Sequence, residues 1–176
     1  GLMSCGLPWW TYDAGGFFRP FDQYENAEYQ ERMIRWIQAS VWLPLMRVHG
    51  YMSRTEPWNY PAEIEKLFVD AIRQRHELKP YVEECAEKVA REGYTIMRPL
   101  YFDFPEDEEA LVISDEYMFG PKYLVCPVLA PGISSMSVYL PENEGGWTDI
   151  RDGAHYDCGR VTVAVDLSAI PVFERN

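Results

Sequence analysis

The sequence predicts an α/β part followed by an all-β part, and three observations support this prediction. Up to about residue 104 the chain alternates short apolar runs with long stretches of helical periodicity. Beyond about residue 115 only short, strand-like runs remain, separated by turns rich in glycine and proline. The acidic run Glu106–Glu109 lies between the two parts and is typical of a solvated linker. We therefore predict one domain over residues 1–104 and a second over residues 105–176.

Composition limits the classes of function. The chain has 176 residues, of which 47% are hydrophobic and 25% charged, and it can bury about two-thirds of its unfolded surface. Its net charge of -12 argues against nucleic acid and against an anionic membrane as partners. No run approaches the roughly 20 apolar residues of a membrane span, and no signal peptide is expected. Four scattered cysteines without a CxxC pair favour free thiols and a reducing compartment such as the cytoplasm.

The first elements are a strand and a helix. Pro8–Tyr12 is a compact apolar run that ends in Asp13–Gly16, so it predicts a buried strand entering a loop. Asn26 is a good N-cap for a helix that Pro44 terminates. The positions expected to face the core recur at helical spacing and are Tyr29, Met33, Trp36, Ile37 and Ser40.

Two more helical pieces and a strand follow. Pro61 suits the first turn of a helix whose apolar stripe is Ile64, Leu67, Phe68, Ala71 and Ile72. Pro80 breaks or kinks this helix, and Gly93 ends the second piece. The run Tyr94–Met97 then predicts a strand.

The last third predicts antiparallel strands of a β-sandwich. Glycine and proline separate the runs, and the clearest run alternates apolar and polar residues as a half-buried strand does. The predicted strands are Tyr123–Leu129, Ser137–Leu140, Arg160–Val165 and a short one near Ile170–Phe173.

The α/β part cannot form a complete parallel sheet from these elements. A parallel strand needs neighbours on both sides and helices on both faces, and the first part supplies two or three β/α units at most. We therefore expect them to be the last units of a larger structure.

Three polar groups follow apolar, strand-like runs. Asp13 follows the first run, Arg47 and His49 follow Leu43–Met46, and Arg98 follows the third. In a β/α barrel the loops at the C-terminal ends of the strands build the active site, so this placement is typical of functional residues. The structural alternative stays open: Asp13 would cap a turn, and Arg47 would pair with a carboxylate.

The chain lacks the usual signatures of several other chemistries. Gly15 and Gly16 belong to no phosphate-binding pattern. We expect them to let the backbone pass close to another group, and a ligand is one candidate for that group. No serine lies in a GxSxG elbow, and the three histidines are not spaced as metal ligands. No cofactor and no metal are predicted. Aromatic residues gather around the candidate segments, and an acidic, aromatic site of this kind favours a neutral carbohydrate.

Nine segments, in order along the chain, resemble glycoside hydrolase family 31, the α-glucosidases and α-xylosidases. The first is close to the family pattern W-x-x-D-I-G-G-F, with Ala14 in place of the usual Ile or Val. The nine are Trp10–Phe17, Arg35–Gln38, Pro44–Gly50, Leu78–Tyr81, Met97–Leu100, Tyr117–Gly120, Leu124–Val128, Val138–Pro141 and Ile170–Phe173.

The resemblance implies a fold and a set of substrate-binding residues. The fold would be the last β/α units of a (β/α)8 barrel followed by an antiparallel β-sandwich domain. Asp13 and His49 match positions that hydrogen-bond the hydroxyls of the sugar in the −1 subsite, and Phe17 matches an aromatic residue lining it. Trp10 and Arg47 match residues at the same site.

The resemblance also implies that no catalytic residue is present here. A retaining glycosidase uses two carboxyl groups about 5–5.5 Å apart, and in this family both precede the segment that contains Asp13. The chain would therefore be part of a retaining α-glycosidase that hydrolyses α-linked glucosides or xylosides, and inactive by itself. Its partners would be the oligosaccharide or glycoside and the remainder of the barrel, with a homo-oligomer left open. The alternatives are a non-catalytic carbohydrate-binding or subunit-interface module, and transglycosylation or lyase chemistry on the same fold.

Overall fold

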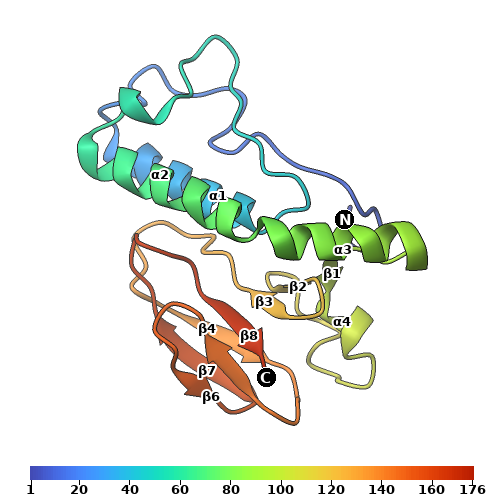
Figure 1. Cartoon of the computed structure of the whole chain (residues 1–176). Helices are drawn as coiled ribbons and strands as arrows, with labels where there is room; N and C mark the ends of the chain where they lie inside the picture. The colour runs from blue at the N-terminus through green and yellow to red at the C-terminus, as the bar shows by residue number, and fades with distance from the viewer.

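Helices form the first half of the molecule and strands the second (Figure 1). The computed structural model describes residues 1–176. The helices are α1 (Ala27–Val41), the 3-10 helix η1 (Pro57–Asn59), α2 (Ala62–Glu77), α3 (Lys79–Glu92) and the short α4 (Leu100–Asp103). None of them is both long and apolar enough to cross a membrane.

Helix α1 begins where the sequence predicts. The Asn26 side chain accepts a hydrogen bond of 3.0 Å from the Tyr29 amide, which satisfies one of the free donors of the first turn. Met33 and Ile37 are fully buried, as expected. Trp36 was expected in the core but is 37% exposed, because it faces an open cavity described below. The helix ends at Val41, before Pro44 is reached.

Proline and glycine divide the next helical stretch as predicted. Pro61 precedes α2, and Glu63 and Glu65 in its first turn complement the positive end of the helix dipole. A new helix, α3, starts at Lys79 with Pro80 in its first turn, where the missing amide hydrogen costs nothing. Gly93 then ends α3 in the left-handed conformation, with φ of 67°.

The strand predicted at Pro8–Tyr12 forms no regular ladder. This segment runs beside residues 45–48, where Leu45 donates to the Trp10 carbonyl over 3.4 Å and Ala14 donates to the Arg47 carbonyl over 3.2 Å. A single parallel bridge joins Ala14 to Val48. With one neighbouring segment instead of two, the chain stays extended, but too few hydrogen bonds form to define a strand.

All ladder pairs in the second half are antiparallel. One sheet has six strands in the order β1-β2-β3-β8-β5-β6, and the other pairs β4 with β7. The strands are β1 (Met97–Pro99), β2 (Tyr117–Phe119), β3 (Tyr123–Val125), β4 (Ser135–Leu140), β5 (Trp147–Asp149), β6 (His155–Tyr156), β7 (Gly159–Ala164) and β8 (Val172–Arg175). The run Tyr94–Met97 was expected as one more strand of the β/α type. The strand lies later, at β1, because its backbone pairs with β2 of the antiparallel sheet.

The helical and β parts share one hydrophobic core. The larger cluster of buried residues contains members of α1 and α2 together with Tyr117, Phe119 and Val125 of the sheet. The Trp42 ring packs edge-on against Phe119 at 5.8 Å, and the Tyr117 hydroxyl donates to the Trp42 carbonyl over 3.1 Å. A second cluster, with Trp147 and Phe173 at its centre, lies within the β part. The two parts therefore pack as one body.

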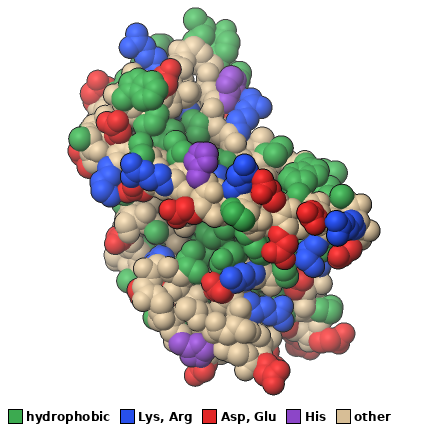
Figure 2. All heavy atoms as spheres, in the orientation of Figure 1, with side chains coloured by type: hydrophobic (Ala, Val, Ile, Leu, Met, Phe, Trp, Pro, Cys, Tyr) green, Lys and Arg blue, Asp and Glu red, His purple; other side chains and the backbone are tan.

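The surface differs between the two ends of the helical part. Acidic and basic side chains are interspersed over α3, whose ion pairs include Lys79 with Glu83 and Arg91 with Glu87 (Figure 2). Hydrophobic side chains project instead at the loop that follows His49, where Tyr51 is 54% exposed and Met52 is 88% exposed. This exposed aromatic end adjoins the candidate site.

Candidate functional site

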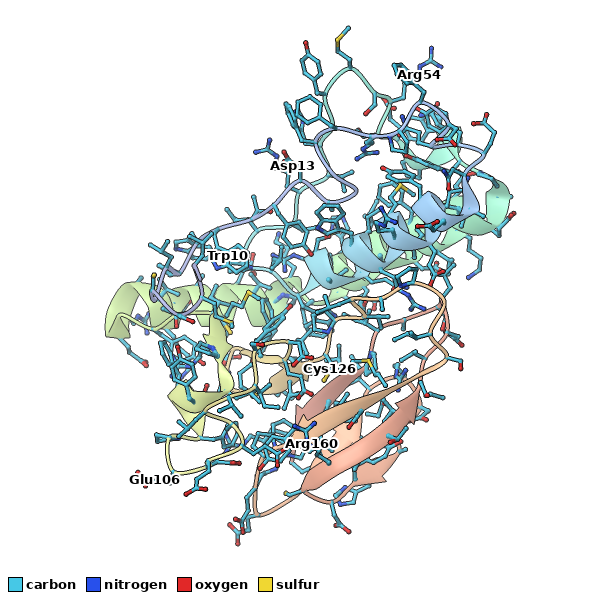
Figure 3. The ribbon with its side chains drawn as sticks, turned by 180° about the vertical axis from the view of Figure 1, so that it is seen from behind. Trp10, Asp13, Arg54, Glu106, Cys126 and Arg160 are labelled. Carbon is cyan, nitrogen blue, oxygen red and sulfur yellow. The ribbon has the colours of Figure 1, made fainter.

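Asp13 and Arg47 form an ion pair at the ends of the two parallel segments. The distance from Arg47 Nε to Asp13 Oδ1 is 2.8 Å. The Arg47 side chain is 51% exposed and that of Asp13 is 24% exposed, so the pair contributes at most about 1 kcal/mol to stability. Its effect is to orient the carboxylate of Asp13 through Oδ1. Figure 3 shows Asp13 on the N-terminal segment, away from the β part.

His49 and Phe17 lie together in the loops that follow these two segments. Their ring centroids are 5.6 Å apart, and Phe17 also stacks on Tyr51 at 5.6 Å with an interplanar angle of 30°. The Tyr51 amide donates to the Phe17 carbonyl over 2.6 Å, which ties the two loops to each other. Asp13, Phe17, Arg47 and His49 therefore come from two loops that are tied to each other at the ends of the two parallel segments. We call these four residues the candidate site.

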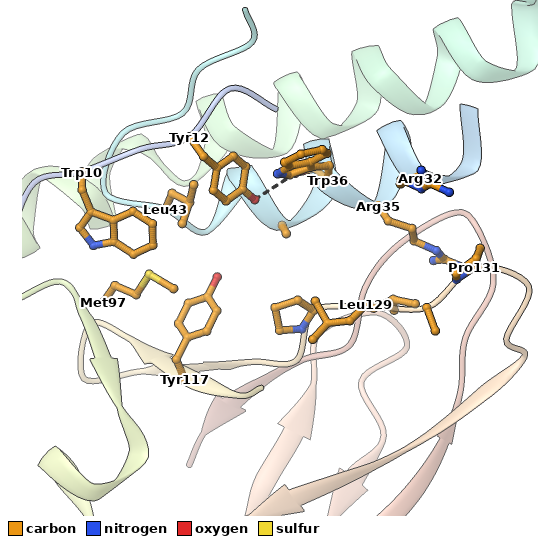
Figure 4. Close-up of a pocket in the computed structure, with 14 residues that line it drawn as sticks. Trp10, Tyr12, Arg32, Arg35, Trp36, Leu43, Met97, Tyr117, Leu129 and Pro131 are labelled. Atoms are coloured by element: carbon orange, nitrogen blue, oxygen red, sulfur yellow. Dashed lines mark hydrogen bonds between the residues drawn. The ribbon is translucent and has the colours of Figure 1, made fainter. Parts of the chain in front are cut away.

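Trp10 does not lie with the four residues of the candidate site. It lines an apolar cavity of about 360 Å³ between the helical and β parts (Figure 4). In this cavity the Tyr12 hydroxyl donates to the Trp36 carbonyl over 3.1 Å. Successive side chains of an extended segment point to opposite sides, so Trp10 and Tyr12 face the cavity and Asp13 faces away from it.

The apolar cavity contains none of the four residues of the candidate site. Its lining is mostly hydrophobic, and its two charged residues are Arg32 and Arg35. The Arg35 guanidinium donates to the Asp166 carbonyl and lies 3.7 Å from Glu31, so it joins α1 to the β part. The cavity thus has the chemistry of an interior seam, whereas the candidate site combines a carboxylate, a guanidinium and an imidazole.

Arg98, the remaining polar residue that follows a strand-like run, has structural partners. Its Nε lies 2.8 Å from Asp103 Oδ2, and its guanidinium lies 4.6 Å from the centre of the Tyr94 ring. These contacts hold α4 against β1 and leave Arg98 little capacity to bind a ligand.

The group that approaches Gly15 closely is a side chain. Gly15 and Gly16 both have φ of 85°, a left-handed conformation that favours glycine. A Cβ atom on Gly15 would lie 3.0 Å from Arg19 Nη2 and 3.2 Å from Met33 Cγ. Arg19 therefore occupies the space that the sequence left open to a ligand. Sequence reasoning missed Arg19, although two glycines before an arginine were a usable signal.

Two side chains, Arg19 and Tyr29, bond the three carbonyl groups of residues 14–16, which we call the glycine loop. Arg19 donates to the carbonyls of Ala14 and Gly16 over 3.1 Å and 3.2 Å. The Tyr29 hydroxyl donates to the Gly15 carbonyl over 2.7 Å. Burial raises the pKa of Tyr29 to about 12, so the phenol remains a donor at neutral pH. The backbone next to Asp13 is therefore fixed from α1 and from the loop itself.

Family models match both parts of the chain. The model of the glycosyl hydrolases family 31 TIM-barrel domain matches residues 1–84, and that of the glycosyl hydrolase family 31 C-terminal domain matches residues 93–176. These matches confirm the predicted fold class, the end of a TIM barrel followed by an antiparallel sheet domain. The boundary at residues 104 and 105 stays a prediction.

Similar proteins include glycosidases from archaea to mammals. An alpha-xylosidase of Saccharolobus solfataricus is 41% identical over 97% of this chain and 23% of its own length. Neutral alpha-glucosidase C of Mus musculus is 36% identical over 100% of this chain and 19% of its own length. A soil-metagenome alpha-xylosidase solved with xylose has a TM-score of 0.90 and 37% identity over 97% of this chain and 28% of that one.

The chain thus spans about a fifth of the length of these two curated relatives. The two family models describe consecutive domains of one family, and they match nearly every residue in the order expected. The chain belongs to glycosyl hydrolase family 31.

Proposed function

We propose that this chain forms part of the sugar-binding wall of a retaining α-glycosidase that hydrolyses α-linked glucosides or xylosides. The observation that carries the proposal is the Asp13–Arg47 ion pair, 2.8 Å long, set beside His49 and Phe17 at the ends of two parallel segments. The known activities of the similar enzymes support the choice of α-glucosides and α-xylosides.

Each residue of the candidate site has a role in this proposal. Asp13 Oδ2 accepts a hydrogen bond from a sugar hydroxyl, while Arg47 holds Oδ1. His49 bonds a neighbouring hydroxyl, and Phe17 packs against the apolar face of the ring. Hydrogen bonds of this kind strengthen as positive charge develops on the sugar ring in the oxocarbenium-like transition state. Each charged contact contributes roughly 2–4 kcal/mol to its stabilisation.

The proposal assigns neither catalytic carboxyl group to this chain. A retaining mechanism requires a carboxylate nucleophile and a carboxylic acid about 5–5.5 Å apart. The charged group paired with Asp13 is Arg47, so Asp13 is suited to binding. We propose that both carboxyl groups belong to the remainder of the barrel in a longer protein, and that the candidate site completes the pocket around them.

The test uses the full-length protein. Asp13→Ala and His49→Ala should each lower kcat on an aryl α-xyloside or α-glucoside by at least about 100-fold, because each removes a contact that strengthens in the transition state. Asp70→Ala is the matched control, since Asp70 pairs with Lys66 on the surface of α2. Near-normal kcat in both site variants, with wild-type activity present, would refute these roles.

The same preparation tests the alternative function. Titration calorimetry with xylose- and maltose-type oligosaccharides measures binding whether or not hydrolysis occurs. Binding that Asp13→Ala abolishes, in a full-length protein without glycosidase activity, would favour a carbohydrate-binding module and overturn the proposed hydrolysis.

A further inference from the structure

Arg19 connects the two loops that carry the candidate site. Its Nη2 donates to the Ala14 carbonyl over 3.1 Å and to the His49 carbonyl over 3.5 Å. Its Nε donates to the Gly16 carbonyl over 3.2 Å. One planar guanidinium thus bonds the backbone on the C-terminal side of Asp13 and the backbone of His49 itself.

A buried pair supports the guanidinium from behind. Arg19 Nη1 donates to the Tyr60 hydroxyl over 3.1 Å, and that hydroxyl donates to Gln23 Oε1 over 3.0 Å. Both Tyr60 and Gln23 are 5% exposed. Burial raises the pKa of Tyr60, so its hydroxyl keeps its proton and stays a donor to Gln23. The position of Arg19 is therefore fixed by the packed interior and not by solvent.

The hydrogen bonds of the Arg19 side chain all go to neutral acceptors, namely backbone carbonyl groups and the Tyr60 hydroxyl. It takes part in none of the ion pairs of the structure, whereas Arg47 in the same region pairs with a carboxylate. An arginine that bonds three carbonyl groups from two loops restricts the backbone of both, because the donors have a rigid planar arrangement.

The glycines of both loops leave room for this side chain. A Cβ atom on Gly50 would lie 2.9 Å from Arg19 Nε and 2.5 Å from Ser53 Oγ. A Cβ atom on Gly15 would lie 3.0 Å from Arg19 Nη2. The two distances at Gly50 are shorter than real Cβ contacts, and at Gly15 the Arg19 side chain would have to shift, so glycine on each loop and arginine between them form one arrangement.

We infer that Arg19 is a positioning residue that holds Asp13 and His49 in the relative placement needed to bind one sugar. The inference rests on the proposed function, because it assigns a catalytic consequence to a contact between two substrate-binding loops. Arg19 itself touches no reacting atom in this account. It acts through the backbone of residues 14–16 and 49.

Two measurements on the full-length protein test the inference, and the first does not depend on activity. Amide hydrogen exchange reports on the backbone hydrogen bonds near Arg19, namely those donated by the amides of Ala14, Gly16 and Tyr51. In Arg19→Ala these three amides should exchange at least about tenfold faster, with α1 unchanged. Arg91→Ala, at a residue whose side chain is 75% exposed on α3, is the control and should change none of them.

The second measurement is kinetic. Arg19→Ala should lower kcat about 100-fold with a smaller change in KM, since a displacement of about 1 Å costs that much when contacts form chiefly in the transition state. Guanidinium at millimolar concentration should restore part of the activity, and Arg19→Lys should retain more than Arg19→Ala. Guanidinium would lower the stability of a destabilised protein further. Recovery of activity on its addition therefore distinguishes a positioning role of Arg19 from a purely structural one.

The outcomes are distinct. The inference would be overturned if, in Arg19→Ala, all three amides exchanged at the wild-type rate. It would also be overturned if kcat of this variant stayed within twofold of the wild-type value. A loss of activity that guanidinium does not restore, accompanied by a lower melting temperature, would also overturn it. A wild-type enzyme that cleaves neither α-glucosides nor α-xylosides would refute the proposed function and the catalytic consequence, while the exchange result would still decide whether Arg19 clamps the loops.

Discussion

Glu116 places a carboxyl group inside the β part. It is 3% exposed, its Oε1 accepts a hydrogen bond of 2.9 Å from the Tyr139 amide, and its Oε2 is buried without a partner. Burial raises the pKa of Glu116 from its ordinary value to about 7. An acid whose pKa is raised on folding stabilises the protein fully below the unfolded pKa, and that contribution is lost as pH rises through the folded pKa. Stability should therefore fall between about pH 4.5 and pH 7.

Glu116→Gln should remove this pH dependence. The amide keeps an acceptor for Tyr139 and carries no charge to desolvate, so the variant should be more stable than wild type at pH 8 by roughly 2–3 kcal/mol. At pH 5 the two should be similar. Thermal unfolding at both pH values measures the difference, with the exposed Glu142→Gln as control. An equal effect of Glu116→Gln at pH 5 and pH 8 would contradict the assignment.

The placement of Asp13, Arg47 and His49 follows from chain order and was predictable, whereas that of Trp10 depends on side-chain direction and was not; their roles as site residues stay predictions. Asp13, Arg47 and His49 follow apolar runs, and the C-terminal ends of adjacent parallel segments meet at one edge. Trp10 belongs to the same run as Asp13 but lies on the opposite side of the extended chain, in the apolar cavity. Arg19 was missed because most of its partners are backbone carbonyls, and the two glycines that precede it were its only signal in the sequence.

At the scale of elements, the turn between β2 and β3 joins the six-stranded sheet to α3. The Tyr81 hydroxyl of α3 donates to the Phe119 carbonyl over 3.0 Å and accepts from the Lys122 amide over 3.1 Å. Gly120, between these two partners, has φ of 62°. A Cβ atom there would overlap the Tyr81 hydroxyl and lie 2.8 Å from Cys85 Sγ.

Gly120→Ala should therefore be costly for two reasons. The left-handed conformation costs about 1 kcal/mol for alanine, and the clash with a packed helix adds roughly 1–3 kcal/mol. Gly132→Ala is the matched control, because Gly132 has a similar φ of 69° with open space around it, and it should cost only the first amount. Denaturant unfolding of both variants measures the two terms. Equal losses in the two variants would mean that the contact with α3 is unimportant.

Helix ends were predictable because proline, glycine and capping residues act locally, as at Asn26, Pro80 and Gly93. Short strands were harder. β2, β5 and β6 were not predicted, since two or three residues show no alternation, and their pairing is decided by strands distant in sequence. β1 joined the antiparallel sheet for the same reason.

At the scale of the molecule, the helical part contributes the candidate site and the β part supports it from the opposite side of α1. Gln38 of α1 donates to the Leu167 carbonyl of the β part over 2.9 Å. The glycine loop rests on the same helix through Tyr29. Composition and motif order were enough to predict this succession of parts. The apolar cavity at the seam between them was not predictable, because it depends on how two surfaces meet.

The most direct test of the account is a crystal structure of the full-length protein with xylose or glucose bound. We predict the sugar beside Asp13 and His49, with a hydroxyl oxygen within about 3.2 Å of Asp13 Oδ2 and the Phe17 ring against the sugar. Arg19 should still bond the carbonyls of Ala14 and Gly16. A sugar bound in the apolar cavity beside Trp10, with no contact to Asp13 or His49, would contradict the account.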